Sequence, residues 1–399
     1  MEMALNEPSS DTSPLLAAQT AGTNSANRIE ALDGLRGIAA LIVVFHHASM
    51  VFSYRSYFEH FGLKLLVAGH GAVIVFFALS GFVLTATCLG KDRAYWPYAI
   101  KRVVCIYVPF AAAVLLAAGL SAAIGHEPVA GASFWFNVQG WHSPVTADLL
   151  WAHLSMGSAN ELDNVIWSLF HEMRISLVIP LLAVLMLKRP RAVLILTLVL
   201  AAIGAFAASR WSADRYLSDC LTSLQYLPLF AAGGAIAIYR HHIVDPLAAL
   251  PRWARALLIL AALAALTVGL ASGPVSSLIM LLKMVISDLG ALVLIAVVLG
   301  GGWLARRVLV HPVALYLGWV SYSLYLTHLL VLEVVVRETQ GRLSHGLQLA
   351  LFFVLAMPIA HLFRMTFEKL GQALGRLMAR AFSGRAATAA PGLGSGVAL

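Results

Sequence analysis

Charged residues are scarce in this chain. Asp, Glu, Lys and Arg make up only 12% of its 399 residues, whereas hydrophobic residues make up 60%. Together with a mean hydropathy of +0.84, this composition excludes an ordinary soluble domain and indicates a polytopic membrane protein. The net charge of +8 does not indicate a nucleic-acid partner, because cytoplasmic loops of membrane proteins carry an excess of Lys and Arg.

Cysteine is scarce too, and a secretion signal is missing. The three cysteines, Cys88, Cys105 and Cys220, have no CxxC spacing, so we expect neither a disulfide framework nor a metal site. Residues 1–27 are polar and lack the basic segment followed by an apolar segment that a signal peptide needs. We expect a disordered cytosolic tail at 1–27, a membrane domain at 28–382 and a flexible Gly- and Ala-rich tail at 383–399.

Long apolar runs, in contrast, are frequent between the two tails. Those long enough to cross a bilayer lie near residues 34–52, 70–89, 103–124, 165–187, 192–209, 221–239, 255–271, 277–299, 312–335 and 347–367. The sequence therefore predicts an all-α bundle of about ten transmembrane helices.

The distribution of Lys and Arg predicts the orientation of this bundle. Of the 27 basic residues, 19 fall on segments that lie on one side of the membrane if the chain starts in the cytoplasm, and 6 fall on the opposite side. Positive charges favour the cytoplasmic side. We therefore expect both termini in the cytoplasm and the protein in the cell (inner) membrane, in contact with its lipids.

The longest loop, residues 125–164, contains no Lys or Arg but several Trp, His, Asp and Glu residues. We place it outside the cell. Such residues suit a sugar-binding or lid segment, and they suit equally well an interfacial loop that rests its Trp rings at the headgroups.

The first predicted helix carries two ionisable side chains on one face. Arg36 and His47 are eleven residues apart, and at about 100° per residue eleven steps return to within roughly 20° of the start. Asp33 lies three residues before Arg36 and can pair with it. An arginine at the membrane surface and a histidine about 16 Å deeper indicate a functional path, because ionisable groups in lipid are costly.

Other predicted spans bring polar residues to a similar depth. Glu172 follows Trp167 in the fourth span, and His328 closes a polar stretch in the ninth. Counting from the helix ends places both in the outer half with His47, where a carboxylate could orient the imidazole. A charge pair of Glu172 with Arg174 or Lys283 that serves only helix packing is the alternative. The residues that we expect to line the path are Asp33, Ser80, Trp167, Ser321, Tyr322 and His328, although hydrogen bonding between helices explains the serines as well.

Four segments in this order resemble the acyltransferase 3 family of integral membrane acyltransferases, in its stand-alone form. They are Leu32-Asp-Gly-Leu-Arg-Gly37 with His47, Phe76-Phe-Ala-Leu-Ser-Gly-Phe82, Trp167-Ser-Leu-Phe-His-Glu172 and Ser321-Tyr-Ser-Leu-Tyr-Leu-Thr-His328. The resemblance covers roughly residues 28–367. It implies transfer of an acyl group, acetyl by default, from acyl-CoA to a hydroxyl of an extracytoplasmic glycan or glycolipid.

The resemblance also implies roles for particular residues. His47 corresponds to the essential histidine of the family, Arg36 to its partner, and Glu172 to the acid of the Trp-Ser-Leu motif. We expect acyl-CoA to bind at Arg36, Lys101 and Arg102. Cys105 stands where the family often has a second arginine, which predicts an altered donor site.

Two mechanisms and two other functions remain open at this point. His47, oriented by Glu172, could deprotonate the acceptor hydroxyl or could carry the acyl group itself. A transporter of a glycan or lipid intermediate could use a similar path through ten helices, and an inactive relative could serve as a structural partner.

Overall fold

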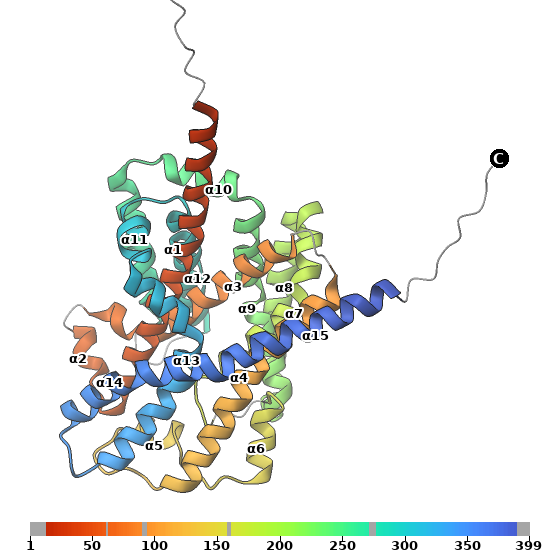
Figure 1. Ribbon diagram of the computed structural model, residues 1–399. Helices are drawn as coiled ribbons and strands as arrows, with labels where there is room; N and C mark the ends of the chain where they lie inside the picture. The colour runs from red at the N-terminus through yellow and green to blue at the C-terminus, as the bar shows by residue number, and fades with distance from the viewer. Residues whose placement is uncertain (1–12, 61–62, 90–93, 158–160, 271–276, 389–399) are drawn as a thin grey trace, which may run out of the picture.

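The computed structural model describes residues 13–60, 63–89, 94–157, 161–270 and 277–388, and these form helices and connecting turns without a β-strand. Figure 1 shows a bundle with α10 at its upper end and α5 and α6 at its lower end. We call these the α10 end and the α5–α6 end. The elements are α1 (Ser13–Val51), α2 (Arg55–His60), η1 (Lys64–Val67), α3 (Gly69–Cys88), α4 (Tyr95–Ile124), α5 (Phe134–Gln139), α6 (Ala147–Leu154), α7 (Trp167–Lys188), α8 (Pro190–Arg210), α9 (Arg215–Ile238), α10 (Arg240–Ala249), α11 (Arg252–Leu266), η2 (Val268–Leu270), α12 (Ser277–Leu299), η3 (Leu304–Leu309), α13 (Pro312–Thr339), α14 (His345–Phe363), η4 (Arg364–Glu368) and α15 (Lys369–Thr388).

Nine helices within the described ranges are long and apolar enough to cross a membrane, which confirms the predicted all-α polytopic bundle. The predicted span at 255–271 differs. It corresponds to α11, whose 15 residues extend about 22 Å, less than the hydrocarbon core of about 30 Å. Helices α10 and α11 are bent by 118° against each other and make a tenth crossing only if they are taken as one broken span.

Helix extends further into both predicted tails than expected. α1 begins at Ser13, where a serine and a proline precede a run of Leu and Ala, residues that suit a helix start and a helix interior. α15 reaches Thr388, beyond residue 383 where we expected the flexible tail to begin. Residues 1–12 and 389–399 lie outside the described ranges.

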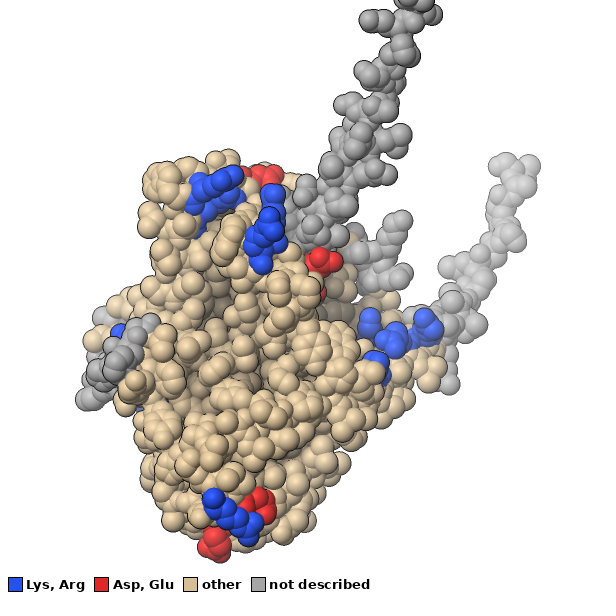
Figure 2. Space-filling view, turned by 60° about the vertical axis from the view of Figure 1, so that its left-hand side comes forward, with Lys and Arg blue, Asp and Glu red and all other residues tan. Residues whose placement is uncertain are grey.

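Charged and apolar side chains lie on different parts of the surface, as in proteins that span a membrane. On the face in Figure 2, charged side chains gather toward the upper and lower ends and at the right-hand edge, and the broad middle is uncharged. Large apolar side chains are exposed along α8, including Ile195, Leu198 and Phe206, each more than half exposed. A belt of this kind is stable against lipid chains and not against water.

Glycine allows the helices of the site to approach closely. A Cβ on Gly318 of α13 would lie 2.1 Å from the carbonyl oxygen of Asp33 in α1, and a Cβ on Gly37 would lie 2.3 Å from the backbone nitrogen of Gly318. A Cβ on Gly81 of α3 would similarly lie 2.2 Å from the carbonyl oxygen of Phe230 in α9. Backbone contacts between small residues are the usual way in which helices associate in membranes, and here they fix α1 beside α13.

Candidate active site

A cavity of about 590 Å³ lies between α1, α3, α4, α7, α13 and η4. On α1 it reaches only Glu30, Asp33 and Arg36, near the α10 end, and its opposite, inner end is formed by Val73, Phe76, Ser168 and Tyr325. The remaining lining residues are Phe77, Ser80, Val83, Leu84, Arg102, Cys105, Ile106, Leu169, Glu172, Leu315, Gly318, Trp319, Ser321, Tyr322, Arg364, Glu368 and Gln372.

Glu172 holds an arginine in this cavity and does not contact His47. Its carboxylate accepts a hydrogen bond from Arg102 of α4, with which it forms an ion pair, and a second one from Ser80 Oγ at 2.9 Å. The expectation that Glu172 orients His47 is therefore wrong. A partly buried carboxylate gains more from a guanidinium than from a neutral imidazole, and α4 brings Arg102 to the face of α7 on which Glu172 lies.

The alternative pairing of Glu172 with Arg174 is not observed either. Arg174 instead donates to Asp219 Oδ2 at 2.6 Å and to Ser223 Oγ at 3.2 Å, which ties α7 to α9. Arg174 thus has a packing role away from the cavity, whereas Glu172 lines it.

Arg36 lines the outer part of the cavity, as expected for a surface arginine on the path. Its guanidinium lies 3.6 Å from Asp33, the predicted partner three residues earlier, and about a third of the side chain is exposed. This ion pair is long and open to solvent. Arg36 can consequently exchange its partner at little cost.

Two lining residues, Arg364 and Glu368, were not singled out from the sequence. They lie on η4, a π-helical turn between α14 and α15, and they form an ion pair. Glu368 also accepts from Ser323 Oγ at 2.7 Å, and the Arg364 guanidinium stacks 4.2 Å from the ring of Trp319. π-helical turns frequently occur at functional sites, but a single-residue widening of a helix leaves no clear mark in hydrophobic periodicity.

The other residues predicted to line the path divide into two groups. Ser80, Ser321 and Tyr322 line the cavity, with Ser321 donating to the Gly318 carbonyl at 2.8 Å and Tyr322 to the Ile106 carbonyl at 2.9 Å. Trp167 and His328 do not line it, and neither does Lys101, which we expected to bind acyl-CoA. Trp167 packs its ring against Phe77, His171 and Tyr226, and Lys101 is exposed on the outer side of α4.

Cys105, in the place of the second arginine of the family pattern, lines the cavity and contacts α15. Its thiol lies 3.8 Å from the carbonyl oxygen of Gly371. Arginine would project further from the same backbone position. The cavity therefore has Arg36, Arg102 and Arg364 as its lining cations, without a contribution from position 105.

His47 and His328 meet beyond the inner end of the cavity. His47 Nδ1 lies 3.0 Å from His328 Nε2, so α1 and α13 bring together two residues that are 281 positions apart. His328 is fully buried, whereas His47 is partly exposed. The neighbouring His46 faces elsewhere and donates from Nδ1 to the Val67 carbonyl at 2.7 Å. The predicted common depth of His47 and His328 is thus confirmed by direct contact.

An aromatic layer separates this histidine pair from the cavity. The Tyr325 ring lies 6.1 Å from that of His328 and 6.1 Å from that of Phe76, and Tyr325 and Phe76 line the cavity while the two histidines do not. The Tyr325 hydroxyl is fixed by Ser168 Oγ at 2.8 Å and by the Val165 carbonyl at 3.0 Å. Tyr325 therefore contacts both the cavity and His328, and two hydrogen bonds hold its hydroxyl.

On the other side of the histidine pair lies the loop that precedes α7. Trp135 of α5 stacks on His47 with ring centroids 5.6 Å apart. Arg337 of α13 clamps the loop by donating to the carbonyl oxygens of Glu127 at 2.7 Å and Trp141 at 2.5 Å, and it pairs with Glu333. The loop is thus attached to the bundle on the α5–α6 side of His47.

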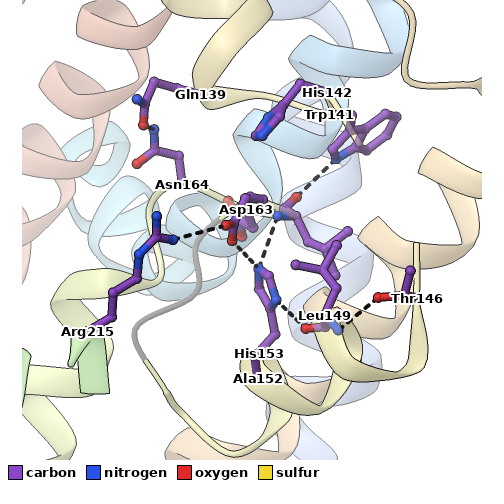
Figure 3. A network of polar contacts seen from close by, with 12 residues as sticks. Gln139, Trp141, His142, Thr146, Leu149, Ala152, His153, Asp163, Asn164 and Arg215 are labelled. Carbon is purple, nitrogen blue, oxygen red and sulfur yellow. Dashed lines mark hydrogen bonds and ion pairs between the residues drawn. The ribbon is translucent and has the colours of Figure 1, made fainter. Parts of the chain in front are cut away.

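A second set of bonds closes the far part of this loop (Figure 3). Trp141 Nε1 donates to the Leu162 carbonyl at 3.0 Å, and the Leu162 backbone N–H donates to His153 Nε2 at 3.1 Å. Asp163 is buried next to these bonds, and burial raises the pKa of its carboxyl well above the usual range. Burial likewise lowers the pKa of His153, so both side chains favour their neutral forms.

Comparison with known proteins agrees with this architecture. Among the described residues, no group of three or more His, Cys, Asp or Glu could hold a metal ion. No curated protein and no solved structure matches the chain. Residues 29–365, however, match the family model described as an acyltransferase domain. Since this match covers most of the chain and nearly all of the membrane bundle, the protein belongs to the acyltransferase 3 family and is a multi-pass membrane acyltransferase.

Proposed function

We propose that this acyltransferase moves an acyl group, acetyl by family analogy, from acyl-CoA to a hydroxyl of an extracytoplasmic glycan or glycolipid. The observation that carries the proposal is the cavity, which leads from an arginine-lined mouth to within one aromatic layer of the histidine pair. A transporter would use a similar path, but membership of an acyltransferase family favours the enzyme.

The orientation in the membrane belongs to the same proposal. The α10 end carries Arg36, Arg240 and Arg252, and the predicted excess of Lys and Arg lies on that side. We take it as the cytoplasmic side of the inner membrane, with both termini there. Acyl-CoA would then enter the cavity from the cytoplasm, and the acceptor would approach His47 from the α5–α6 end.

The three arginines of the cavity differ in their ion pairs, and these differences indicate which arginine binds the donor. Arg102 and Arg364 are each paired closely with a carboxylate, so they hold the cavity walls and offer their remaining N–H groups. Arg36 has only the long, exposed contact with Asp33. We therefore assign the principal phosphate contact to Arg36, since a guanidinium binds phosphate oxygens through two parallel hydrogen bonds.

The chemical step follows from the position of His47. In direct transfer, His47 takes the proton of the acceptor hydroxyl while the oxygen attacks the thioester carbonyl. The carbon–sulfur bond breaks, and the protonated imidazole returns the proton to the thiolate of CoA. For the thioester to reach His47 the layer of Phe76 and Tyr325 has to open, and opening it at Tyr325 would break the two hydrogen bonds of its hydroxyl.

The test is acyl transfer by the purified protein in lipid nanodiscs, combined with mass spectrometry of surface glycans and glycolipids from cells with and without it. We expect a mass difference of one acyl group that His47→Ala abolishes, whereas His241→Ala, at an exposed histidine of α10, retains it. Arg36→Ala should raise the KM for acyl-CoA about tenfold, the loss of roughly one charged hydrogen bond. Full transfer by a correctly inserted His47→Ala protein would refute the proposal.

If the acyl group is instead carried by His47, a rapid quench with labelled acyl-CoA and no acceptor will trap label on the protein. Direct transfer predicts no labelled protein under these conditions.

A further inference from the structure

The hydrogen bonds of His328 determine which of its ring nitrogens carries a proton. His328 Nδ1 lies 3.0 Å from the carbonyl oxygen of Leu324, one turn earlier on α13. A carbonyl oxygen can only accept, so Nδ1 of His328 carries the hydrogen and donates it. In a neutral imidazole the other nitrogen, Nε2, is then unprotonated and can only accept.

Both rings are neutral in this environment. His328 is fully buried, and neither histidine has a carboxylate within ion-pair distance among the described residues. Burying an imidazolium without a counter-charge would be costly. The neighbours of the pair are uncharged groups instead. They are the backbones of Leu324 and Val43, the Tyr325 ring beside His328, and the Trp135 and His46 rings beside His47.

The protonation state of the two ring nitrogens of His47 follows from that of His328. Because His328 Nε2 can only accept, the nitrogen that faces it at 3.0 Å, Nδ1 of His47, has to donate. His47 then carries its proton on Nδ1, and the lone pair of its Nε2 is free. The chain Leu324 carbonyl, His328, His47 thus leaves one defined basic nitrogen on the partly exposed ring.

We infer that His328 is a positioning residue that holds His47 in the Nδ1-protonated form and so presents Nε2 as the base. This inference rests on the proposed function. His328 does not touch the substrates, since it is fully buried and absent from the cavity walls. It takes the place that a carboxylate holds in a catalytic triad, where the third residue selects the tautomer of the base.

The arrangement also accounts for the proton during the reaction. When Nε2 of His47 accepts the hydroxyl proton, the ring becomes an imidazolium whose Nδ1–H already donates to His328. The hydrogen bond strengthens as the charge forms, and it relaxes when Nε2–H gives the proton to the leaving thiolate. No proton leaves the pair, so the step balances within the two histidines and the two substrates.

The test compares two substitutions at the same position. In His328→Gln the side-chain amide oxygen can still accept from Nδ1 of His47, whereas His328→Leu removes this acceptor and leaves the backbone of Val43, one turn earlier on α1, as the remaining partner of the His47 ring. We expect His328→Leu to lower kcat by about 10²- to 10³-fold, within the roughly 10²- to 10⁴-fold that general-base catalysis contributes, with little change in the KM for acyl-CoA. His328→Gln should retain kcat to within about tenfold.

The decisive readout is the tautomer, measured by ¹⁵N NMR of protein with labelled histidine, with the His47 signals assigned by their loss in His47→Gln. We expect a protonated Nδ1 and an unprotonated Nε2 in the wild type and in His328→Gln, and a shift toward Nε2–H in His328→Leu. A wild-type ring protonated at Nε2 overturns the inference, even if His328→Leu fails to fold. An unchanged tautomer together with an unchanged kcat in a folded His328→Leu overturns it too.

The proposed function fails separately, through absence of acyl transfer by the wild type. The tautomer is measured without substrate, so the two failures are distinguishable.

Discussion

Replacing Glu172 with alanine leaves the Arg102 guanidinium without its carboxylate inside the cavity wall. Removing one partner of a buried ion pair costs about 3–5 kcal/mol. Because 21% of the Arg102 side chain and 20% of the Glu172 side chain are exposed, water recovers part of this, and we expect a loss of about 2–3 kcal/mol in the free energy of unfolding. The Ser80 hydroxyl, which donates to the same carboxylate, adds about 1 kcal/mol.

Replacing both residues by apolar ones separates the effect of the pair from that of its surroundings. Arg102→Ala should cost a similar amount, whereas the double variant Arg102→Met/Glu172→Leu should lie within about 1 kcal/mol of the wild type, because apolar residues can replace a buried pair. The assay is denaturant unfolding in detergent micelles, followed by tryptophan fluorescence. Asp245→Ala, which breaks an exposed pair with His241, is the control and should change little. Costs below 1 kcal/mol for both single variants, or a double variant that loses their sum, would refute the reasoning.

The activity of a Glu172 variant separates the two roles that the residue was given. If Glu172 oriented His47, Glu172→Gln would lower kcat as strongly as a change at His47 itself. The observed contact with Arg102 predicts instead that Glu172→Gln mainly raises the KM for acyl-CoA, because it loosens the wall of the donor cavity.

Three further variants test other parts of the structure. Gly318→Val should prevent folding, because its Cβ would lie 2.1 Å from the Asp33 carbonyl oxygen. Gly119→Ala should be tolerated, because a Cβ at Gly119 would have nothing within 4 Å. Expression levels and size-exclusion profiles in detergent compare the two variants. Arg337→Ala should release the loop at residues 125–142, so that backbone hydrogen exchange becomes faster there and not in α8. An exchange rate in this loop equal to that of the wild type would contradict the role of Arg337. The raised pKa of Asp163 means that the folded protein holds this proton more tightly than the unfolded chain. The contribution of Asp163 to stability is therefore fully present below the ordinary Asp pKa of about 4 and is lost as pH rises through the raised value. Asp163→Asn should flatten this part of the melting temperature profile against pH, and an unchanged profile would contradict it.

Depth in the membrane could be predicted from the sequence, whereas direction around a helix could not. Counting residues from helix ends placed His47 and His328 at one level, and they are in contact. The same counting placed Glu172 with them, but its carboxylate faces Arg102. The face that a residue of one helix presents depends on which helix lies beside it, and that choice is made by contacts such as Gly37 against Gly318, which no single helix reveals.

Pairs of residues on one helix were the part of the site that could be predicted most directly from the sequence. Asp33 and Arg36 pair as their spacing predicted, because both lie on one helix. Arg364 and Glu368 could not be predicted, since in the sequence they are ordinary charged residues that follow an apolar run. Their position in the cavity depends on the π-helical turn of η4, which rotates them relative to the rest of α14.

The aromatic layer of Phe76 and Tyr325 has a consequence for the cell as well as for the reaction. If the cavity opened freely onto the histidine pair, water could reach two titratable rings from the cavity side, while the loop covers them on the other side. Water and titratable rings in a row could conduct protons across the membrane. One layer of ring carbons interrupts that column of water. In the orientation proposed above, the protein can therefore keep this cavity in a membrane that holds a proton gradient without letting protons through, and the layer has to open only when a bound substrate fills the gap.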